Sequence, residues 1–146
     1  MPRPYASGVV PASADDVWEI VRQFNGLPSW HPMITESEIE DGRTAQEAGA
    51  VRNLTLADGA QVSERLLILD DDDRSYTYAF TDPGPLPVRS YRSTVRVAPI
   101  TATGEAFVEW WAWFDSDADV EQDMTNTFAA GVYGAGIEAL VTHFKG

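Results

Sequence analysis

The sequence predicts an α+β domain in which a curved antiparallel sheet of seven strands wraps around a long C-terminal helix. Two observations support this fold class. Between about residues 34 and 116, apolar and polar residues alternate with period 2 in six runs that turn sequences separate. The stretch "VEQDMTNTFAAGVYGAGIEALVTHF" then predicts a long helix, the only element large enough to cover one face of such a sheet.

A strand and a helix come first. The stretch "YASGVV" (residues 5–10) predicts a short strand, which Pro11 ends. Ser13, with Asp16 three residues later, is typical of the N-cap of a helix, here "SADDVWEIVRQF". Gly26 ends this helix, and the two prolines of "NGLPSWHPMI" allow only a turn or one very short second helix after it.

Six further strands follow, and hairpin-like turns join them, so the sheet is expected to be mostly antiparallel. The expected strands span residues 34–40, 49–56, 61–69, 74–81, 89–98 and 105–116. The turn sequences between them are Asp41-Gly42, Asp58-Gly59, Asp70 to Asp73, "DPGPLP" and Thr103-Gly104.

The composition describes one acidic globular domain spanning residues 1–146. The formal net charge of −13 argues against a nucleic-acid partner, because phosphate binding needs clustered Lys and Arg. No apolar run reaches the roughly 18 residues of a membrane span, and the N-terminus lacks the apolar stretch of a signal peptide. We therefore expect a cytoplasmic protein without integral membrane association. The absence of cysteine excludes disulfides and thiolate chemistry.

No metal or other cofactor is expected. His31 and His143 lie far apart, and neither has a second histidine three or four residues away, as a zinc site would. The acidic run from Asp70 to Asp73 lacks the ligand spacing and the glycine of an EF-hand loop. We interpret this run as a solvated turn.

The strand "VEWWAWFD" indicates which side chains face inward. Its even-numbered set, Val108 to Phe114 with Trp110 between them, contains no charge and is assigned to the interior. Trp111 and Trp113 then lie on the outer face. An exposed aromatic patch often marks a partner surface, which here favours a homodimer. The alternative is that a loop or the chain's own N-terminus covers the two tryptophans.

The hairpin "VRNLTLADGAQVSERLLIL" places two charges inside. A three-residue turn with Gly59 in the left-handed position sets Leu54 opposite Val62 and Arg52 opposite Glu64. Because a buried charge is costly unless paired, one interpretation is a partly solvated ion pair at a cavity rim. The other is a polar anchor for a ligand carbonyl, carboxylate or phenol. Attraction to the arginine is expected to lower the pKa of the glutamate, which favours anchoring over base chemistry.

Aromatic residues continue the inward face on the neighbouring strands. Together they would line either a ligand cavity with a few hydroxyl groups or a fully packed core. These residues are Tyr76, Tyr78, Phe80, Tyr91, Ser93, Trp110 and Phe114. Gly131, Gly134 and Gly136 interrupt the last helix, which indicates a close approach to the sheet or room kept for a ligand. Tyr133 belongs to an inward stripe of that helix.

The order of the elements and several stretches resemble the START/Bet v 1-like "helix-grip" superfamily, also called SRPBCC. The stretches are "DDVWEIVRQF", "GLPSWHP", "GAVRNLTLADGAQVSERLLILDDDDRSYTYAF", "PLPVRSYRSTVRV", "VEWWAWF" and "VYGAGIEAL". Within it, the likeness is to bacterial polyketide cyclase/dehydrase-like proteins. The resemblance implies a helix-grip fold with a cavity between sheet and helix. The superfamily includes lipid carriers, hormone and alkaloid binders, aromatic cyclases and co-chaperone-like modules, so the fold does not fix the function.

The leading functional hypothesis is binding of a hydrophobic or aromatic small molecule (polyketide-, lipid- or phenol-like) in this cavity, with no cofactor. The expected ligand-contacting residues are Trp30, His31, Arg52, Glu64, Tyr78, Tyr91, Trp110, Phe114 and Tyr133. One alternative is an aromatase/cyclase or dehydratase, with Glu64 or His31 as proton acceptor and Tyr78 or Tyr91 as donor. Another is a protein-interaction module with a collapsed cavity.

The segment "NGLPSWHPMI" is placed near one mouth of the cavity. Trp30, as the apolar member of the pair, is expected to form an inward wall. His31 has no partner that the sequence identifies, and we expect it at the rim, bonded to backbone or water. The two prolines fix the cavity's edge.

Overall fold

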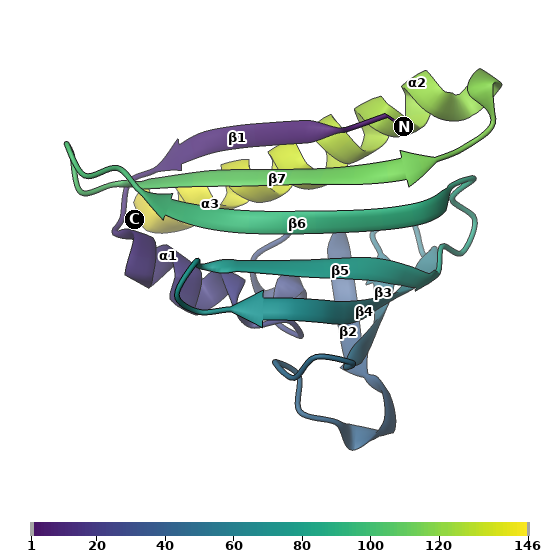
Figure 1. The fold of residues 1–146 in the computed structure, drawn as a ribbon, viewed down its shortest axis with the longest axis horizontal. Helices are drawn as coiled ribbons and strands as arrows, with labels where there is room; N and C mark the ends of the chain where they lie inside the picture. Colours follow the sequence, from purple (N-terminus) through teal and green to yellow (C-terminus); the bar gives the residue numbers. More distant parts are fainter. Residues whose placement is uncertain (1, 146) are drawn as a thin grey trace.

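The computed structural model describes residues 2–145 and contains a seven-stranded sheet, a helix after the first strand and a long C-terminal helix (Figure 1). The strands are β1 (Tyr5–Val10), β2 (Ile34–Ile39), β3 (Val51–Leu56), β4 (Gln61–Asp70), β5 (Ser75–Asp82), β6 (Arg89–Pro99) and β7 (Ala106–Asp115). The helices are α1 (Ala14–Val21), η1 (Leu27–Ser29), η2 (Glu40–Gly42), α2 (Ala118–Asn126), η3 (Thr127–Gly134) and α3 (Ala135–Lys145). The predicted fold class is confirmed.

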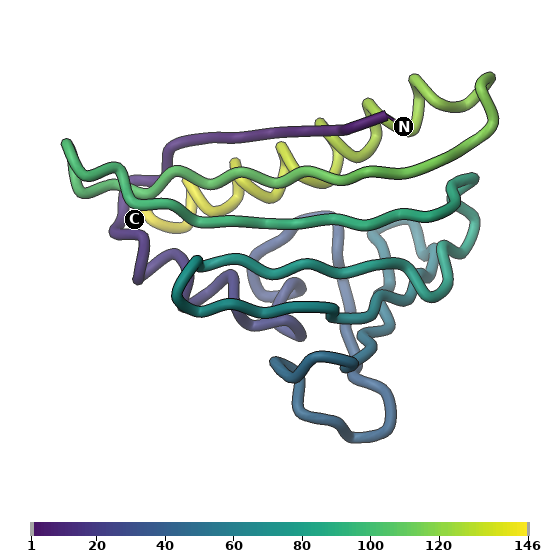
Figure 2. Tube along the Cα trace, viewed as in Figure 1, coloured from purple at the N-terminus to yellow at the C-terminus, as the bar shows by residue number. Residues whose placement is uncertain are grey.

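Every neighbouring pair of strands is antiparallel, and the sheet order is β1-β7-β6-β5-β4-β3-β2. The first and last strands therefore pair with each other, while β2 lies at the far edge. The C-terminal helix passes behind β1 and β7 and contacts both strands, so the sheet wraps around it (Figure 1). Between β2 and β3 the chain makes a loop that extends away from the sheet (Figure 2).

The predicted register of the β3–β4 hairpin is confirmed. Leu54 pairs with Val62, and Arg52 pairs with Glu64. Gly59 has a φ of 89°, the left-handed conformation that the three-residue turn requires and that glycine adopts without steric cost. Since side chains alternate across a strand, this register places both charged residues on the inner face.

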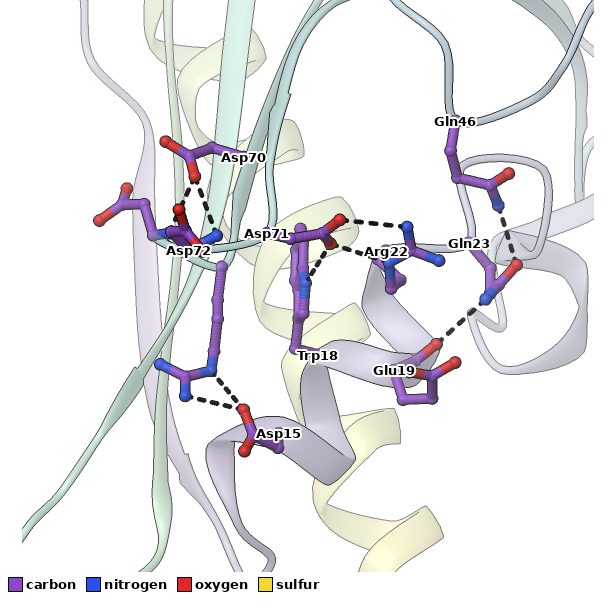
Figure 3. Close-up of polar contacts among 11 residues, drawn as sticks. Asp15, Trp18, Glu19, Arg22, Gln23, Gln46, Asp70, Asp71 and Asp72 are labelled. Atoms are coloured by element: carbon purple, nitrogen blue, oxygen red, sulfur yellow. Dashed lines mark hydrogen bonds and ion pairs between the residues drawn. The ribbon is translucent and has the colours of Figure 1, made fainter.

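The β4–β5 turn does more than the solvated turn we expected, because it holds α1 in place (Figure 3). Asp71 accepts hydrogen bonds of 2.9 Å from the Trp18 indole nitrogen and from Nε of Arg22. Three residues further along the same turn, Arg74 forms a 2.7 Å ion pair with Asp15. Both ends of α1 are therefore tied to one turn of the sheet, and this fixes the helix beside the inner face.

The C-terminal helix is continuous from residue 118 to residue 145, but its middle eight residues, Thr127–Gly134, form a π-helix. The sequence pattern does not predict this change of winding. π-Helical turns are rare and are frequently found at functional sites.

The predicted close approach is found at one glycine of this helix, and another glycine lies beside open space. A Cβ on Gly136 would lie 2.8 Å from both His31 Cδ2 and Trp110 Cζ3, so this glycine permits close approach to the sheet. A Cβ on Gly131 would have no atom within 4 Å, so the space beside this residue is open.

The inner and outer faces of β7 are as predicted. Trp110 is 2 % exposed and belongs to the core, whereas Trp113 is 45 % exposed. The chain's own N-terminus partly covers the outer tryptophans, since the Arg3 guanidinium lies 5.6 Å from the Trp111 ring centroid and 5.5 Å from that of Trp113. Dimerisation through Trp111 and Trp113 remains a prediction.

No helix among residues 2–145 is long and apolar enough to cross a membrane.

Gly136→Ala is expected to lower the free energy of unfolding by about 1–3 kcal/mol, because the new methyl group would overlap His31 and Trp110. Gly131→Ala is the matched control and should change stability by less than about 1 kcal/mol, since its methyl group enters open space. Urea unfolding measures both values. Equal effects of the two substitutions would contradict the close approach at Gly136.

Candidate ligand cavity

A cavity of about 160 Å³ lies between the inner face of the sheet and the π-helical segment. Its inner part is formed by Leu54, Val62, Glu64, Tyr78, Phe80, Tyr91 and Phe128. The remaining lining residues are Met33, Ile34, Leu56, Asp58, Leu86, Thr127, Gly131 and Val132, of which Met33, Asp58 and Thr127 are exposed. Most of the lining is apolar, as is typical of small-molecule sites. A wider hollow of about 760 Å³ along β2, β3 and β4 is lined mainly by polar side chains.

Arg52 and Glu64 form a buried ion pair. Both Nε and Nη2 of the arginine lie 2.8 Å from the same carboxylate oxygen, Oε1. Nη1 donates a 2.6 Å hydrogen bond to the carbonyl of Phe24, which lies in the turn after α1. The Arg52 side chain is 0 % exposed, so the expectation of a partly solvated pair at the rim is wrong.

Three aromatic rings surround the guanidinium group and explain its burial. Its central carbon lies 4.0 Å from the Phe24 ring centroid, 4.8 Å from that of Tyr78 and 5.7 Å from that of Tyr76. Aromatic faces attract cations, so these rings replace part of the hydration that Arg52 has lost. Arg52 is not among the residues that line the cavity, and its Nε and Nη1 atoms donate hydrogen bonds to protein groups.

Glu64, in contrast, lines the cavity while being only 5 % exposed. Its Oε2 atom accepts no hydrogen bond from residues 2–145. Within that range, the fully buried side-chain atoms that lack a hydrogen bond are Trp30 Nε1 and Arg52 Nη2. Because Glu64 Oε2 also lacks a hydrogen bond but is not one of these atoms, it keeps some accessible surface. Burial raises the pKa of the Glu64 carboxyl, and the Arg52 charge offsets only part of this increase. The expected lowering of this pKa is therefore wrong.

The hydroxyl groups near the cavity already have partners inside the protein. The Tyr91 and Tyr133 hydroxyls are hydrogen-bonded to each other, and the Tyr78 hydroxyl accepts a 3.2 Å bond from the Trp110 indole nitrogen. Burial raises the pKa of Tyr78, Tyr91 and Tyr133, so all three stay protonated. Tyr78 and Tyr91 line the cavity, whereas Tyr133, Trp110 and Phe114 lie in the core beyond its lining.

His31 lies in the core and not at the rim, since it is 2 % exposed. Its Nδ1 accepts a 3.1 Å hydrogen bond from the Met33 N–H, and its Nε2 donates a 2.7 Å bond to the Val132 carbonyl. These bonds fix the neutral tautomer and leave neither nitrogen free as a proton acceptor. The expected bonding to backbone is confirmed.

Trp30 is half-buried against His31 and Trp110 and borders a separate hollow beside α3.

Several lining residues were not among the predicted contacts. Leu54 and Val62 share the inner face with Glu64, so the hairpin register could have identified them. Met33 and Leu86 come from irregular segments, where no periodicity tells which way a side chain points. Gly131 is one of the three helix glycines for which a close approach or room for a ligand is expected, and the open space beside it decides between the two.

The architecture is that of a helix-grip protein, and comparisons with known proteins agree. The family described as polyketide cyclase / dehydrase and lipid transport matches residues 1–145, and the chain belongs to this family. No curated protein matches the sequence. The resemblance to the START/Bet v 1-like superfamily is confirmed.

Solved structures share this fold along nearly the whole chain. The protein XoxI from Bacillus cereus is 32 % identical, with a TM-score of 0.88 over 99 % of this chain and 96 % of that one. An uncharacterised protein from Bacillus thuringiensis is also 32 % identical, with a TM-score of 0.86 over 99 % of this chain and 100 % of that one. Norcoclaurine synthase from Thalictrum flavum, solved with dopamine and hydroxybenzaldehyde, is 19 % identical, with a TM-score of 0.77 over 97 % of this chain and 85 % of that one. At this lower identity the likeness concerns the fold alone.

The burial of His31 predicts a loss of stability in mild acid. Burial lowers its pKa from the ordinary 6.5, so below that pH the unfolded chain binds a proton that the folded protein does not. The free energy of unfolding should therefore fall as the pH drops from about 6.5 through the lowered pKa, with a slope approaching about 1.4 kcal/mol per pH unit. Urea unfolding between about pH 7.5 and 5 measures it.

The raised pKa of Glu64 gives the free energy of unfolding a pH dependence of the opposite sign, and it does so in both wild type and His31→Gln. The difference in stability between the two proteins therefore isolates the effect of His31. The stability difference between wild type and His31→Gln should shrink as the pH falls. His143→Gln, at the exposed histidine of α3, supplies the comparison with a histidine that is not buried. A pH-independent difference for His31→Gln would contradict the assignment.

Arg52→Met is expected to destabilise the protein by about 3–5 kcal/mol, because Glu64 would keep a buried charge without a partner. Adding Glu64→Leu in the same chain should recover much of this loss, since no uncompensated charge then remains. The control is Arg89→Met, whose ion pairs with Asp115 and Asp117 are exposed and should contribute at most about 1 kcal/mol. Chemical denaturation provides the comparison, and a loss for Arg52→Met no larger than that of the control would refute the buried pair.

Proposed function

We propose that the protein binds a hydrophobic or aromatic small molecule in the cavity between the sheet and the π-helical segment. The observation that carries this proposal is the cavity itself, a mostly apolar space of about 160 Å³ whose lining contains two carboxylates, the buried Glu64 and the exposed Asp58. Apolar walls with few polar groups favour small-molecule binding over a packed core. Gly131 supports the proposal, because it leaves open a space that any larger side chain would occupy.

The size of the cavity limits the ligand that fits without rearrangement. An engineered protein cavity of about 150 Å³ holds benzene, so a space of this size suits a single aromatic ring with small substituents. Norcoclaurine synthase, with the same fold, has been solved with dopamine and hydroxybenzaldehyde, which are single-ring molecules. This supports an aromatic ligand for the present cavity, with Tyr78, Tyr91 and Glu64 as its contacts.

Proton transfer by Glu64 is the second candidate function, and the raised pKa of this cavity-lining carboxyl is the observation that favours it. A carboxylate with a raised pKa is a better proton acceptor near neutral pH than an ordinary one. His31 does not fit this role, because both of its nitrogens are bonded within the protein. Turnover of a poly-β-keto substrate that survives in Glu64→Gln would exclude Glu64 as the proton-transfer group.

Gly131→Leu is expected to abolish binding of aromatic probes, because its side chain would fill the cavity. The fold should be retained, since a Cβ at this position meets no atom within 4 Å. Ala130→Leu is the matched control, because Ala130 is exposed on the same helical segment. Heteronuclear NMR titration with toluene measures binding in both variants. Toluene affinity that is equal in wild type and Gly131→Leu would contradict the proposed site.

A further inference from the structure

The polar groups of the cavity differ in whether the protein already uses them. Besides the paired tyrosine hydroxyls, Thr127 donates a 2.9 Å hydrogen bond to the Asp123 carbonyl, and Asp58 Oδ1 accepts a 2.9 Å bond from the Ala60 N–H. Thr127 and Asp58 are also exposed and lie at the mouth. In the inner part of the cavity, the polar atom without a protein partner among residues 2–145 is Glu64 Oε2. This atom can only accept a hydrogen bond while the carboxylate is ionised.

The charge balance of the site favours an uncharged ligand. Arg52 neutralises Glu64 at 2.8 Å, and both side chains are almost completely buried. An ammonium group would bring a further positive charge close to Arg52, and a carboxylate would face the lone pairs of Oε2. Beside Glu64, either ion would lose its hydration without a free counter-charge, because the other lining carboxylate, Asp58, is exposed to solvent. Such a loss is costly in an apolar site. A hydroxyl group avoids this cost and supplies the missing donor.

The surrounding rings favour a flat ligand. The Phe80 and Tyr91 rings are stacked with their centroids 4.1 Å apart, and the Phe128 ring lies 4.8 Å from that of Tyr91. All three residues line the cavity beside Glu64. Rings packed in this way offer faces and edges against which another aromatic ring is stabilised.

We propose that the ligand is a small single-ring phenol whose uncharged hydroxyl group donates a hydrogen bond to Oε2 of Glu64. The inference rests on the proposed binding function and names the chemical class of the ligand. Arg52 is then a positioning residue: by holding Oε1 with two nitrogen atoms, it leaves Oε2 for the ligand. The acceptor in the cavity selects for a donor, so carbonyl and carboxylate ligands, which the sequence also left open, are disfavoured.

A panel of probes of similar size tests this inference on the wild-type protein. The probes are phenol, toluene, benzaldehyde, benzoate and benzylammonium, titrated by heteronuclear NMR. Phenol should bind about tenfold or more tightly than toluene or benzaldehyde, because a hydrogen bond to a charged acceptor adds to the same ring contacts. Equal affinities for phenol and toluene would overturn the inference and leave the cavity function standing. Preferential binding of a charged probe would also overturn the inference, and binding of no probe would overturn both proposals.

Glu64→Gln sharpens the test, because it should exchange the preference. The amide oxygen would accept from Arg52 in place of Oε1, and the amide NH₂ would then face the cavity as a donor. The variant should bind benzaldehyde more tightly than phenol. Glu38→Gln, at an exposed position on β2, is the control and should keep the wild-type order. Unchanged preference for phenol in Glu64→Gln would refute the role of Oε2, and if this variant does not fold, the wild-type panel decides alone.

Discussion

The buried ion pair between Arg52 and Glu64 is the interaction on which the rest of the structure depends. It joins β3 to β4 across the inner face of the sheet, and the bond from Arg52 to the Phe24 carbonyl links both strands to the turn after α1. A buried pair of this kind contributes little net stability, but an unpaired member would be strongly destabilising. The arrangement therefore fixes which parts of the chain can pack together more than it adds to the free energy of unfolding.

This pair also decides which part of the site a ligand meets. The arginine is enclosed by Phe24, Tyr76 and Tyr78, so its charge is satisfied inside the protein. The glutamate lies between the arginine and the cavity and has one oxygen for each. The same geometry suits two uses of Glu64, a hydrogen bond to a ligand and proton transfer to or from it. A turnover measurement separates these two uses, because binding alone needs no turnover.

The fold and part of the site follow from local sequence, and the remainder depends on contacts between distant segments. The turn at Gly59 fixes the hairpin register, so the pairing of Arg52 with Glu64 could be predicted from a few residues. The depth of its burial could not, because Phe24 and Tyr76 reach Arg52 only in the folded chain. His31 is similar: its place in the core depends on Val132, which lies 101 residues away.

The winding of the C-terminal helix has a consequence for how the protein tolerates change. In a regular α-helix each residue rotates the side-chain direction by about 100° around the helix axis. A π-helical segment has a different number of residues per turn. Removing one residue between Thr127 and Gly134 would rotate everything after it, including Gly136 where it contacts Trp110. Substitutions in this segment do not change the rotation of the residues that follow it. The number of residues here is therefore a stricter requirement than their identity, and length variation should be rarer than sequence variation among proteins that keep this packing.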